Sequence, residues 1–372
     1  MPRVHTAAVV GKQLTQAFYG TPFTKAYHAS CSTGGRQAMK AAQEFPDDFD
    51  GIVAGAPAFA FSNLTSYGGW QWTAGGSPSS PQYVKSSMWG MIHKEVIRQC
   101  DHLDGYKDGI IEDFEQCQFD INPLLCKSLN TKVGTCLNQA QAAFVRAFYR
   151  PLLQRDGSII FPGTPIGTEP TFISGYGTPL QITVDWYQNV VFENLKWNLS
   201  SLSLEDMAHA WKLNPQNINT WNGDLTKFKA RGGKLIHYHG TADNVIPATI
   251  SAKYYNYVME TMKATPNDLD TFYRYFPIPA MEHCMGGIGA WDFGQSGFTP
   301  SRMNPNENIL LSIIEWVEQG RAPEKLIGTA YNKTMSSFKR GHCRYPKTNK
   351  FKETGNPKDP QNWECVEKNK RA

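Results

Sequence analysis

The order of apolar and polar positions predicts alternating strands and helices in the first sixty residues. Near the start, five small or apolar residues recur at the spacing of one helix face: Ala7, Ala8, Gly11, Leu14 and Phe18. A β-prone run over 25–29 is followed by a Ser/Gly turn over 30–35 and by helix formers over 36–45. An apolar run over 49–57 then ends in a Gly/Pro turn. This alternation predicts a parallel sheet and therefore the α/β class.

A second part of the chain has the same character, and the region between the two parts does not. The pattern resumes after residue 232 with two strands and two helices: strand 233–240, helix 248–262, strand 272–276 and helix 308–318, followed by a polar tail. Between them, aromatic residues and Gly/Ser/Pro loops dominate, and helical patterns are sparse. We therefore expect an α/β domain made of 1–62 and 232–372, interrupted by an inserted domain over 63–231.

Composition and charge exclude several kinds of partner. The chain has 372 residues, of which 41% are hydrophobic, enough for a sizeable core. Its 37 Lys and Arg against 33 Asp and Glu give a net charge of +4 without a basic stripe, which argues against nucleic acid as a partner. No stretch approaches the roughly 20 apolar residues of a spanning helix, so we expect no membrane partner either. The oligomeric state is left open.

The cysteines favour an oxidising compartment. There are eight, without the C-x-x-C pairs of zinc sites, so disulfides are the better interpretation. Three N-x-[ST] acceptors, at Asn63, Asn198 and Asn332, agree with a secreted glycoprotein. Yet the first twenty residues contain no apolar signal segment. Either the chain starts inside a longer secreted protein, or it is cytosolic with idle thiols.

The turn after the first predicted strand has the composition of a nucleophile elbow. Residues 30–34 read Ser-Cys-Ser-Thr-Gly, the G-x-S-x-G motif with serine in the first glycine position. The motif needs small residues because its nucleophile, here Ser32, sits on a strained strand-to-helix turn. The backbone N–H of Thr33 is then a natural oxyanion donor at a helix N-terminus. An ordinary Gly/Ser loop is the alternative for the motif alone.

The partners of a serine nucleophile follow in the order that an α/β-hydrolase requires. Asp243 lies in a turn after the strand 233–240, and His283 follows the next strand. His283 would accept the proton of Ser32, and Asp243 would orient the imidazole. His237 and His239, on one strand face, could share a metal, although sheet packing explains them more simply.

Two cysteines flank this constellation. Cys31 precedes Ser32 and Cys284 follows His283, so a bond between them would tie the nucleophile to its base. At this point the chain resembles the tannase and feruloyl esterase family, whose signature is Cys-Ser, then Asp, then His-Cys. The matching residues here are Cys31-Ser32, Asp243 and His283-Cys284.

The resemblance implies an α/β-hydrolase fold whose inserted domain acts as a lid. It implies a secreted serine carboxylic ester hydrolase whose partner is a phenolic acid ester of plant origin, most simply a feruloyl esterase, with a tannase as the alternative. Four lid aromatics could stack on the substrate or belong to the lid core: Tyr67, Trp70, Trp72 and Trp89. A catalytically silent calcium-binding glycoprotein, or a truncated gene model, is the alternative of another class.

Family members carry a segment before the elbow that includes a signal peptide, the first strands of the sheet and a loop with the second oxyanion donor. This chain begins one helix before Ser32. We therefore expect an α/β-hydrolase fold that is incomplete at its N-terminus. We also expect an activity impaired by the loss of that donor.

The inserted region also contains an acidic loop between Cys100 and Cys117. Its carboxylates at 101, 104 and 108 have a spacing that differs from an EF-hand, and an acidic turn without metal is the alternative. The resemblance implies a structural Ca²⁺ site made of five residues: the side chains of Asp101, Asp104 and Asp108 and the carbonyls of Tyr106 and Ile110. It also implies the remaining disulfides: Cys100 with Cys117, Cys126 with Cys136, and Cys343 with Cys365.

Overall fold

The chain folds into two compact units, each described here by itself. The computed structural model describes residues 2–127, 134–169, 178–297, 303–332 and 335–368. The first unit consists of Met1–Phe59, Thr220–Gly240 and Ser251–Ala372, and the second of Ala60–Asn219 and Thr241–Ile250. The sequence predicted an insert over 63–231. The second unit covers a similar stretch, Ala60–Asn219, together with a separate segment of ten residues, Thr241–Ile250.

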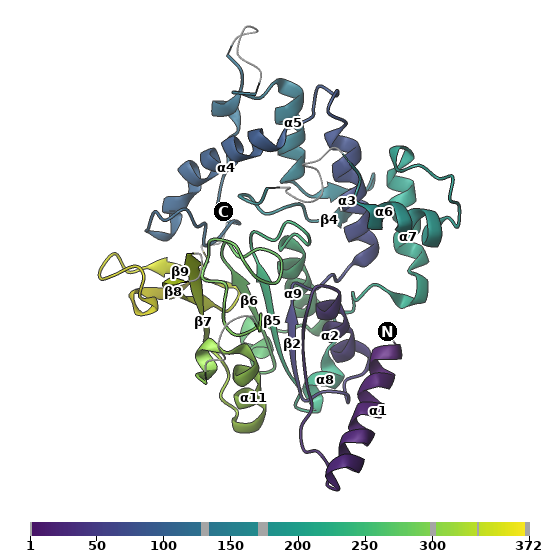
Figure 1. Cartoon of the computed structure of the whole chain (residues 1–372), viewed down its shortest axis with the longest axis vertical. Helices are drawn as coiled ribbons and strands as arrows, with labels where there is room; N and C mark the ends of the chain where they lie inside the picture. Colours follow the sequence, from purple (N-terminus) through teal and green to yellow (C-terminus); the bar gives the residue numbers. More distant parts are fainter. Residues whose placement is uncertain (1, 128–133, 170–177, 298–302, 333–334, 369–372) are drawn as a thin grey trace. The chain divides into compact units, whose positions relative to one another are not determined.

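A four-stranded parallel sheet forms the centre of the first unit (Figure 1). Its strands lie in the order β1 (Tyr27–Cys31), β2 (Gly51–Gly55), β5 (Lys234–Gly240) and β6 (Tyr273–Ile278). Every neighbouring pair is parallel, so the carboxyl ends of all four strands meet at one edge. The predicted α/β class is confirmed, and the strand that precedes Ser32 ends at that edge.

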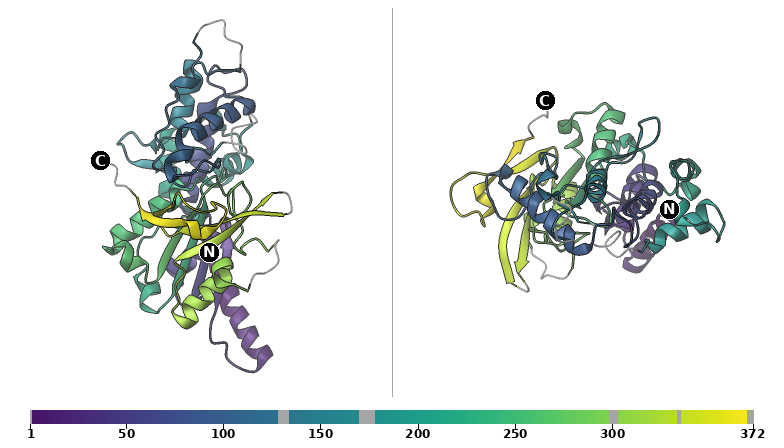
Figure 2. Two further views of the ribbon diagram at one scale, coloured as in Figure 1. Left: turned by 90° about the vertical axis from the view of Figure 1, so that its left-hand side faces the viewer. Right: turned by 90° about the horizontal axis from the view of Figure 1, so that it is seen from above.

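The alternation of side chains along β5 explains how helices cover both faces of the sheet (Figure 2). Ile236 and Tyr238 point toward α11 (Ile309–Gln319) and share a buried cluster with its apolar residues. His237 and His239 point to the other face, where both contact Ser251 of α9 (Thr249–Met262). A strand buried on both faces is what a parallel sheet between helices requires.

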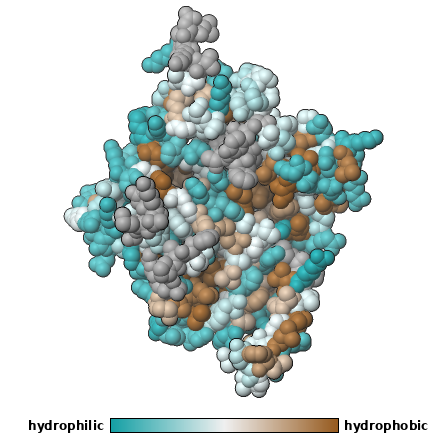
Figure 3. Space-filling view, viewed as in Figure 1, coloured by the Kyte–Doolittle hydropathy of each residue, from teal (hydrophilic) through white to brown (hydrophobic). Residues whose placement is uncertain are grey.

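Most of the predicted elements of the first unit form within a few residues of their expected ends. The helix after the elbow is α2 (Thr33–Glu44), and the first helix is α1 (Pro2–Tyr19). The apolar face of α1 is exposed, with Leu14 at 65% and Phe18 at 82% of their maximal accessible area. Figure 3 shows hydrophobic surface at the bottom of the view, where Figure 1 places α1. The remaining short helices of this unit are α8 (Thr226–Ala230), α10 (Pro266–Leu269), η6 (Pro305–Glu307) and η7 (Pro360–Asn362).

The polar tail expected from the sequence forms two antiparallel hairpins. The strands are β7 (Lys325–Asn332), β8 (Met335–Cys343), β9 (Lys347–Phe351) and β10 (Trp363–Glu367). The guanidinium carbon of Arg340 lies 3.5 Å from the centroid of the buried Trp363 ring, and the Cys343–Cys365 disulfide joins the two hairpins. These strands show no apolar periodicity in the sequence, because cation–π stacking and a disulfide replace part of an apolar core.

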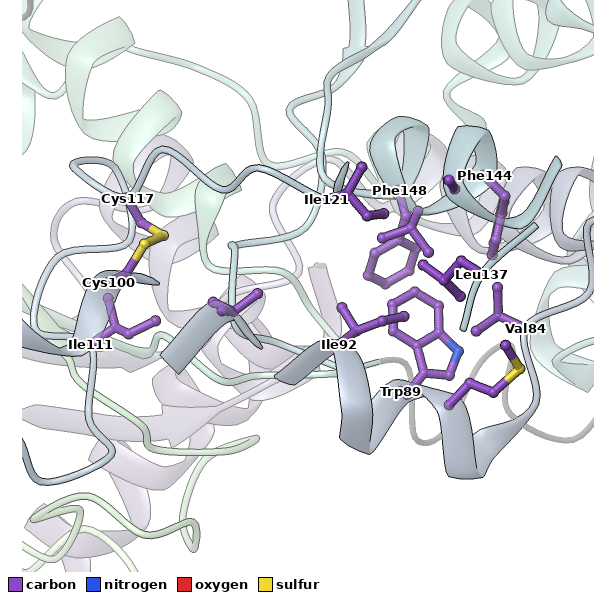
Figure 4. Close-up of a cluster of buried hydrophobic side chains, with 14 residues drawn as sticks. Val84, Trp89, Ile92, Cys100, Ile111, Cys117, Ile121, Leu137, Phe144 and Phe148 are labelled. Atoms are coloured by element: carbon purple, nitrogen blue, oxygen red, sulfur yellow. A yellow bond between two sulfur atoms is a disulfide. The ribbon is translucent and has the colours of Figure 1, made fainter. Parts of the chain in front are cut away.

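The second unit is mainly helical and has its own core. Its longer helices are α3 (Phe61–Gly75), α4 (Ser86–Cys100), α5 (Gln139–Phe148) and α7 (Leu204–Leu213). Trp89, Ile92, Phe144 and Phe148 centre a buried cluster between α4 and α5 (Figure 4). Short elements complete the unit: η1 (Asp101–Asp104), η2 (Asn122–Leu124), β3 (Leu152–Leu153), β4 (Ile159–Phe161), α6 (Gln181–Asp185), η3 (Trp186–Val191), η4 (Leu199–Ser201) and η5 (Pro215–Asn217). Across the described ranges, no helix combines the length and apolar composition needed to cross a bilayer.

Candidate active site

Ser32 occupies a sharp turn between β1 and α2. Its backbone has φ 66° and ψ −122°, a conformation that costs a non-glycine residue about 1–3 kcal/mol and persists only where neighbours enforce it. The turn is pressed against β2, because the N–H of Ser32 donates to the carbonyl of Gly55 at 3.0 Å. A Cβ on Gly35 would lie 2.1 Å from that same carbonyl oxygen, so only glycine fits there. The predicted elbow is therefore a strained turn.

The hydroxyl of Ser32 is directed at an imidazole. Serine is a good helix N-cap residue, yet Ser32 caps α2 without a side-chain hydrogen bond to the helix. Its Oγ lies 2.9 Å from Nε2 of His283 instead. Thr33 is the first residue of α2, and N–H groups in the first turn of a helix have no intrahelical acceptor. The structure thus brings the imidazole of His283 to the turn that carries Ser32 and Thr33.

His283 is held by close backbone packing. A Cβ on Gly240, the last residue of β5, would lie 2.3 Å from the carbonyl oxygen of Met281 and 2.5 Å from that of Glu282. After His283, Cys284 has φ 65°. The side chain of Gln295 donates to the carbonyl of Cys284 at 3.4 Å. Neither Gly240 nor Gln295 stands out in the sequence, because their role depends on contacts between segments far apart in the chain.

Asp243 lies three residues beyond the end of β5 and is fully buried. Its Oδ1 accepts hydrogen bonds from the N–H groups of Val245 and Ile246 at 2.9 and 2.8 Å. The same loop is tied within the second unit, since the hydroxyl of Thr168 donates to the carbonyl of Thr241 at 2.9 Å. The structure therefore gives Asp243 a fixed carboxylate in the expected loop, and its role in the triad stays a prediction.

All eight cysteines are paired as the resemblance implied. The bond between Cys31 and Cys284 joins the neighbours of Ser32 and His283 across 253 residues. The other three join nearer neighbours: Cys100–Cys117, Cys126–Cys136 and Cys343–Cys365. The Cys31–Cys284 bond therefore links the nucleophile turn covalently to the loop that carries His283.

The two histidines of β5 form part of a buried polar chain. His237 contacts Tyr273 OH through Nδ1 at 3.0 Å and Ser251 Oγ through Nε2 at 2.9 Å, and Ser251 Oγ contacts His239 Nδ1 at 2.6 Å. Burial and the neighbouring His239 hold the pKa of His237 well below its usual value. In the described part of the chain, no group of three or more His, Cys, Asp or Glu side chains could hold a metal. Packing in the sheet therefore explains this pair.

The acidic loop of the second unit holds its carboxylates in turns. Asp101 and Asp104 are buried in η1, where Oδ1 of Asp101 accepts from the N–H of Gly109 at 3.0 Å and Oδ1 of Asp104 accepts from that of Tyr106 at 2.8 Å. Oδ1 of Asp108 accepts from the N–H of Ile110 at 3.1 Å. Hard oxygen donors of this kind suit Ca²⁺, but the described residues do not gather the three carboxylates into one cluster. The loop fits a calcium ion in donor chemistry only.

Two of the four candidate stacking aromatics belong to the core of the second unit. Tyr67 is 1% exposed and donates its hydroxyl to the carbonyl of Phe148, and Trp89 is 3% exposed. Trp70 and Trp72 are partly exposed. Core packing, the alternative left open by the sequence, therefore explains Tyr67 and Trp89.

Comparisons with known proteins agree with the geometry. The model of the family described as tannase and feruloyl esterase matches residues 2–366. A probable feruloyl esterase B-1 of Aspergillus oryzae is 44% identical over 366 residues, which cover 98% of this chain and 68% of the relative. A probable feruloyl esterase B of Aspergillus clavatus is 43% identical over 369 residues and is covered to 70%.

Solved structures are also similar. The crystal structure of feruloyl esterase B from Aspergillus oryzae superimposes with a TM-score of 0.94 at 44% identity, over 97% of this chain and 73% of that one. A tannin acyl hydrolase from Aspergillus niger superimposes with a TM-score of 0.79 at 23% identity, over 97% and 68% of the two chains. The second likeness concerns the fold alone.

Proposed function

The chain belongs to the tannase and feruloyl esterase family of carboxylic ester hydrolases, and we propose that it releases ferulic acid and related hydroxycinnamic acids from esters of plant cell-wall polysaccharide. It has an α/β-hydrolase fold. The single observation that carries the proposal is the 2.9 Å contact between Ser32 Oγ and His283 Nε2 at a strained strand-to-helix turn. The relatives at 43–44% identity, named probable feruloyl esterase B-1 and probable feruloyl esterase B, support this substrate class.

In the mechanism we propose, Ser32 is the nucleophile. Its Oγ attacks the ester carbonyl while Nε2 of His283 accepts the hydroxyl proton. The negative charge on the former carbonyl oxygen is stabilised by the N–H of Thr33 at the positive end of α2. The imidazolium then protonates the leaving sugar or alcohol oxygen as the carbon–oxygen ester bond breaks. A water molecule, deprotonated by His283, hydrolyses the acyl-enzyme and restores the serine.

Asp243 completes the proposed triad. A carboxylate in this role fixes the imidazole tautomer and stabilises its protonated form. The chain order Ser32, Asp243, His283 and the two backbone hydrogen bonds that hold Asp243 support the assignment. Asp243→Asn keeps the size of the side chain, so a fall of about 10⁴-fold in kcat would identify the charge as the active feature.

The experiment that tests the function measures hydrolysis of methyl ferulate by the parent chain and by Ser32→Ala. We expect a measurable rate in the parent and at least a 10³-fold loss in the variant. Methyl caffeate and methyl gallate, assayed in parallel, decide between a feruloyl esterase and a tannase, and preference for the gallate would refute the proposed substrate. Equal rates for the parent and Ser32→Ala would refute the nucleophile.

We further propose that the loop from Asp101 to Ile110 binds a structural Ca²⁺. Buried Asp side chains and backbone carbonyls are the donors that Ca²⁺ prefers, and the Cys100–Cys117 bond closes the loop. The calcium ion would add stability and take no part in the ester chemistry. A melting temperature lowered by EDTA and restored by Ca²⁺ but not by Mg²⁺ would support this site, and the same melt in Asp104→Asn should be insensitive to EDTA.

Four disulfides favour folding in an oxidising compartment, and we propose that the enzyme is secreted and glycosylated. Asn198 is the best placed acceptor, since it is exposed at the start of η4. Asn63 is half-buried in α3, where the hydroxyl of Thr65 is bound to the carbonyl of Ser62. The acceptor at 332–334 includes residues outside the described ranges. A glycan lost in Asn198→Gln but kept in Asn63→Gln would support this assignment.

A further inference from the structure

The turn that carries Ser32 departs from the usual elbow at one position, because Ser30 stands where the motif has its first glycine. A Cβ placed on Gly34 would lie 2.8 Å from Cβ and 3.2 Å from Oγ of Ser30. The end of strand β1 and the first turn of helix α2 therefore touch through the Ser30 side chain. Ser30 fills the space that a glycine at this position would leave open.

The hydroxyl of Ser30 is hydrogen-bonded to a neighbouring histidine. Nε2 of His28 lies 2.9 Å from Ser30 Oγ. His28 and Ser30 are two residues apart on β1, so both side chains point to the same face of the strand. The half-buried ring of His28 also packs on Phe49, with 5.0 Å between centroids.

We propose that His28, Ser30 and Gly34 form a clamp across the nucleophile turn, and that His28 is a positioning residue for Ser32. The side chain of Ser30, two places before Ser32, packs on Gly34, two places after it, and His28 holds the Ser30 hydroxyl. Its effect follows from the strain in the turn: the backbone of Ser32 relaxes unless both sides are held. The clamp thereby fixes the direction of Ser32 Oγ toward His283 and the position of the Thr33 N–H.

This inference rests on the proposed function, since it assigns His28 a role only if Ser32 is the nucleophile. It also separates His28 from His283, which contacts the reacting hydroxyl itself. His28 contacts neither Ser32 Oγ nor substrate in this scheme. Its loss should change the rate of attack by Ser32 and leave substrate affinity nearly unaltered.

His5 offers a matched control for a His→Phe substitution. Nδ1 of His5 contacts the carboxylate of Asp48 at 2.9 Å, and its ring stacks on Phe45 with 4.3 Å between centroids. His5 thus combines one side-chain hydrogen bond and one aromatic contact, as His28 does, but it lies on α1 away from the elbow in the sequence. His5→Phe should keep the parent rate.

The test compares His28→Phe, Ser30→Ala, the double variant, His28→Gln and His5→Phe. Two quantities are measured: kcat and KM on methyl ferulate, and the rate at which a fluorophosphonate labels Ser32, followed by intact mass. We expect each single loss to lower kcat and labelling on the order of tenfold, with KM within about twofold. The double variant should be no slower than the worse single variant, because both remove one interaction. His28→Gln, whose amide reaches the place of Nε2, should recover most of the rate.

Other outcomes overturn the clamp. Losses that multiply in the double variant would mean that His28 and Ser30 act separately. A His28→Phe or Ser30→Ala chain that melts earlier but keeps kcat and labelling would reduce the contact to a structural one. A parent chain labelled at Ser32 but inactive on methyl ferulate refutes the proposed substrate, while labelling still tests the clamp. A parent chain that is never labelled refutes the proposed function and the clamp together.

Discussion

Replacing Gly240 by alanine tests whether the close packing at the end of β5 sets the position of His283. A Cβ at this position would lie 2.3 Å from the carbonyl oxygen of Met281 and 2.5 Å from that of Glu282. Both are backbone atoms that no rotamer change can move aside. Gly240 belongs to a regular parallel pair with β6, opposite Ile278, so alanine adds a methyl group without a backbone conformation that it disfavours.

The structure gives the size of the effect. An ordinary contact of a methyl carbon with a neighbouring atom begins near 3.4 Å, so the loop must retreat by about 1 Å from its present 2.3 Å. Glu282 is the residue before His283, and the shift passes to the imidazole through one peptide unit. A displacement of about 1 Å in a reacting group costs on the order of 100-fold in rate, or about 2.7 kcal/mol.

The assay is hydrolysis of methyl ferulate by Gly240→Ala, with kcat and KM determined separately. We expect kcat to fall by about 100-fold while KM changes little, because the loss concerns proton transfer and not substrate contacts. Gly11→Ala is the matched control, since a Cβ there meets nothing within 4 Å on the exposed helix α1. A Gly240→Ala enzyme that melts like the parent and keeps its kcat would refute the reasoning.

Three further outcomes are expected. Replacing Cys31 and Cys284 together by alanine should lower the free energy of unfolding by up to about 5 kcal/mol, judged by urea titration, because the 253-residue loop is no longer closed. Burial holds the pKa of His342 at about 4, so the unfolded chain binds the extra proton as the pH falls from about 6.5 to about 4. Stability should decline by about 3 kcal/mol over that window, and His342→Gln, which can still donate to the carbonyl of Ala290, should show a flatter curve. Phe148→Ala should cost about 3–5 kcal/mol in the second unit without changing KM, since the ring is 1% exposed.

Local patterns predicted the parallel sheet and its helices, because a dozen residues or fewer contain the apolar and polar pattern of each element. The run around β2 is continuous and apolar, as a strand buried on both faces requires, and β5 is buried from its second residue onward although it carries two histidines. The C-terminal hairpins were not predicted because their strands lack an apolar periodicity. The stacking of Arg340 on Trp363 and a disulfide stabilise them instead. The exposure of Leu14 and Phe18 on α1 was equally invisible, since periodicity predicts a helix face and not what covers it.

The candidate site was predictable where its chemistry follows chain order. Ser32 and His283 were identified from their motif and spacing, and the structure places them in hydrogen-bonding contact. The residues that hold the His283 loop were missed, because Gly240 and Gln295 act through contacts with segments that lie elsewhere in the chain. His28 lies within the predicted strand 25–29, and nothing in that pattern indicates a role at the site. The packing of Ser30 on Gly34 depends on the sharpness of the turn, which the sequence does not reveal.

Several structural features hold Ser32 and His283 in place, and the size of the rate loss on removing each one distinguishes positioning residues from catalytic ones. Ser32 and Cys284 both have φ near 65°. Ser32 follows Cys31 directly, and the Cys31–Cys284 disulfide joins the two strained turns. Glycine contacts press each turn against neighbouring backbone, and a disulfide links the two turns covalently. Because these supports overlap, removing any one of them should slow the reaction by a limited factor, whereas removing the Ser32 hydroxyl should abolish acyl transfer. Variants of the supports that abolished labelling of Ser32 outright would show that they belong to the chemistry itself.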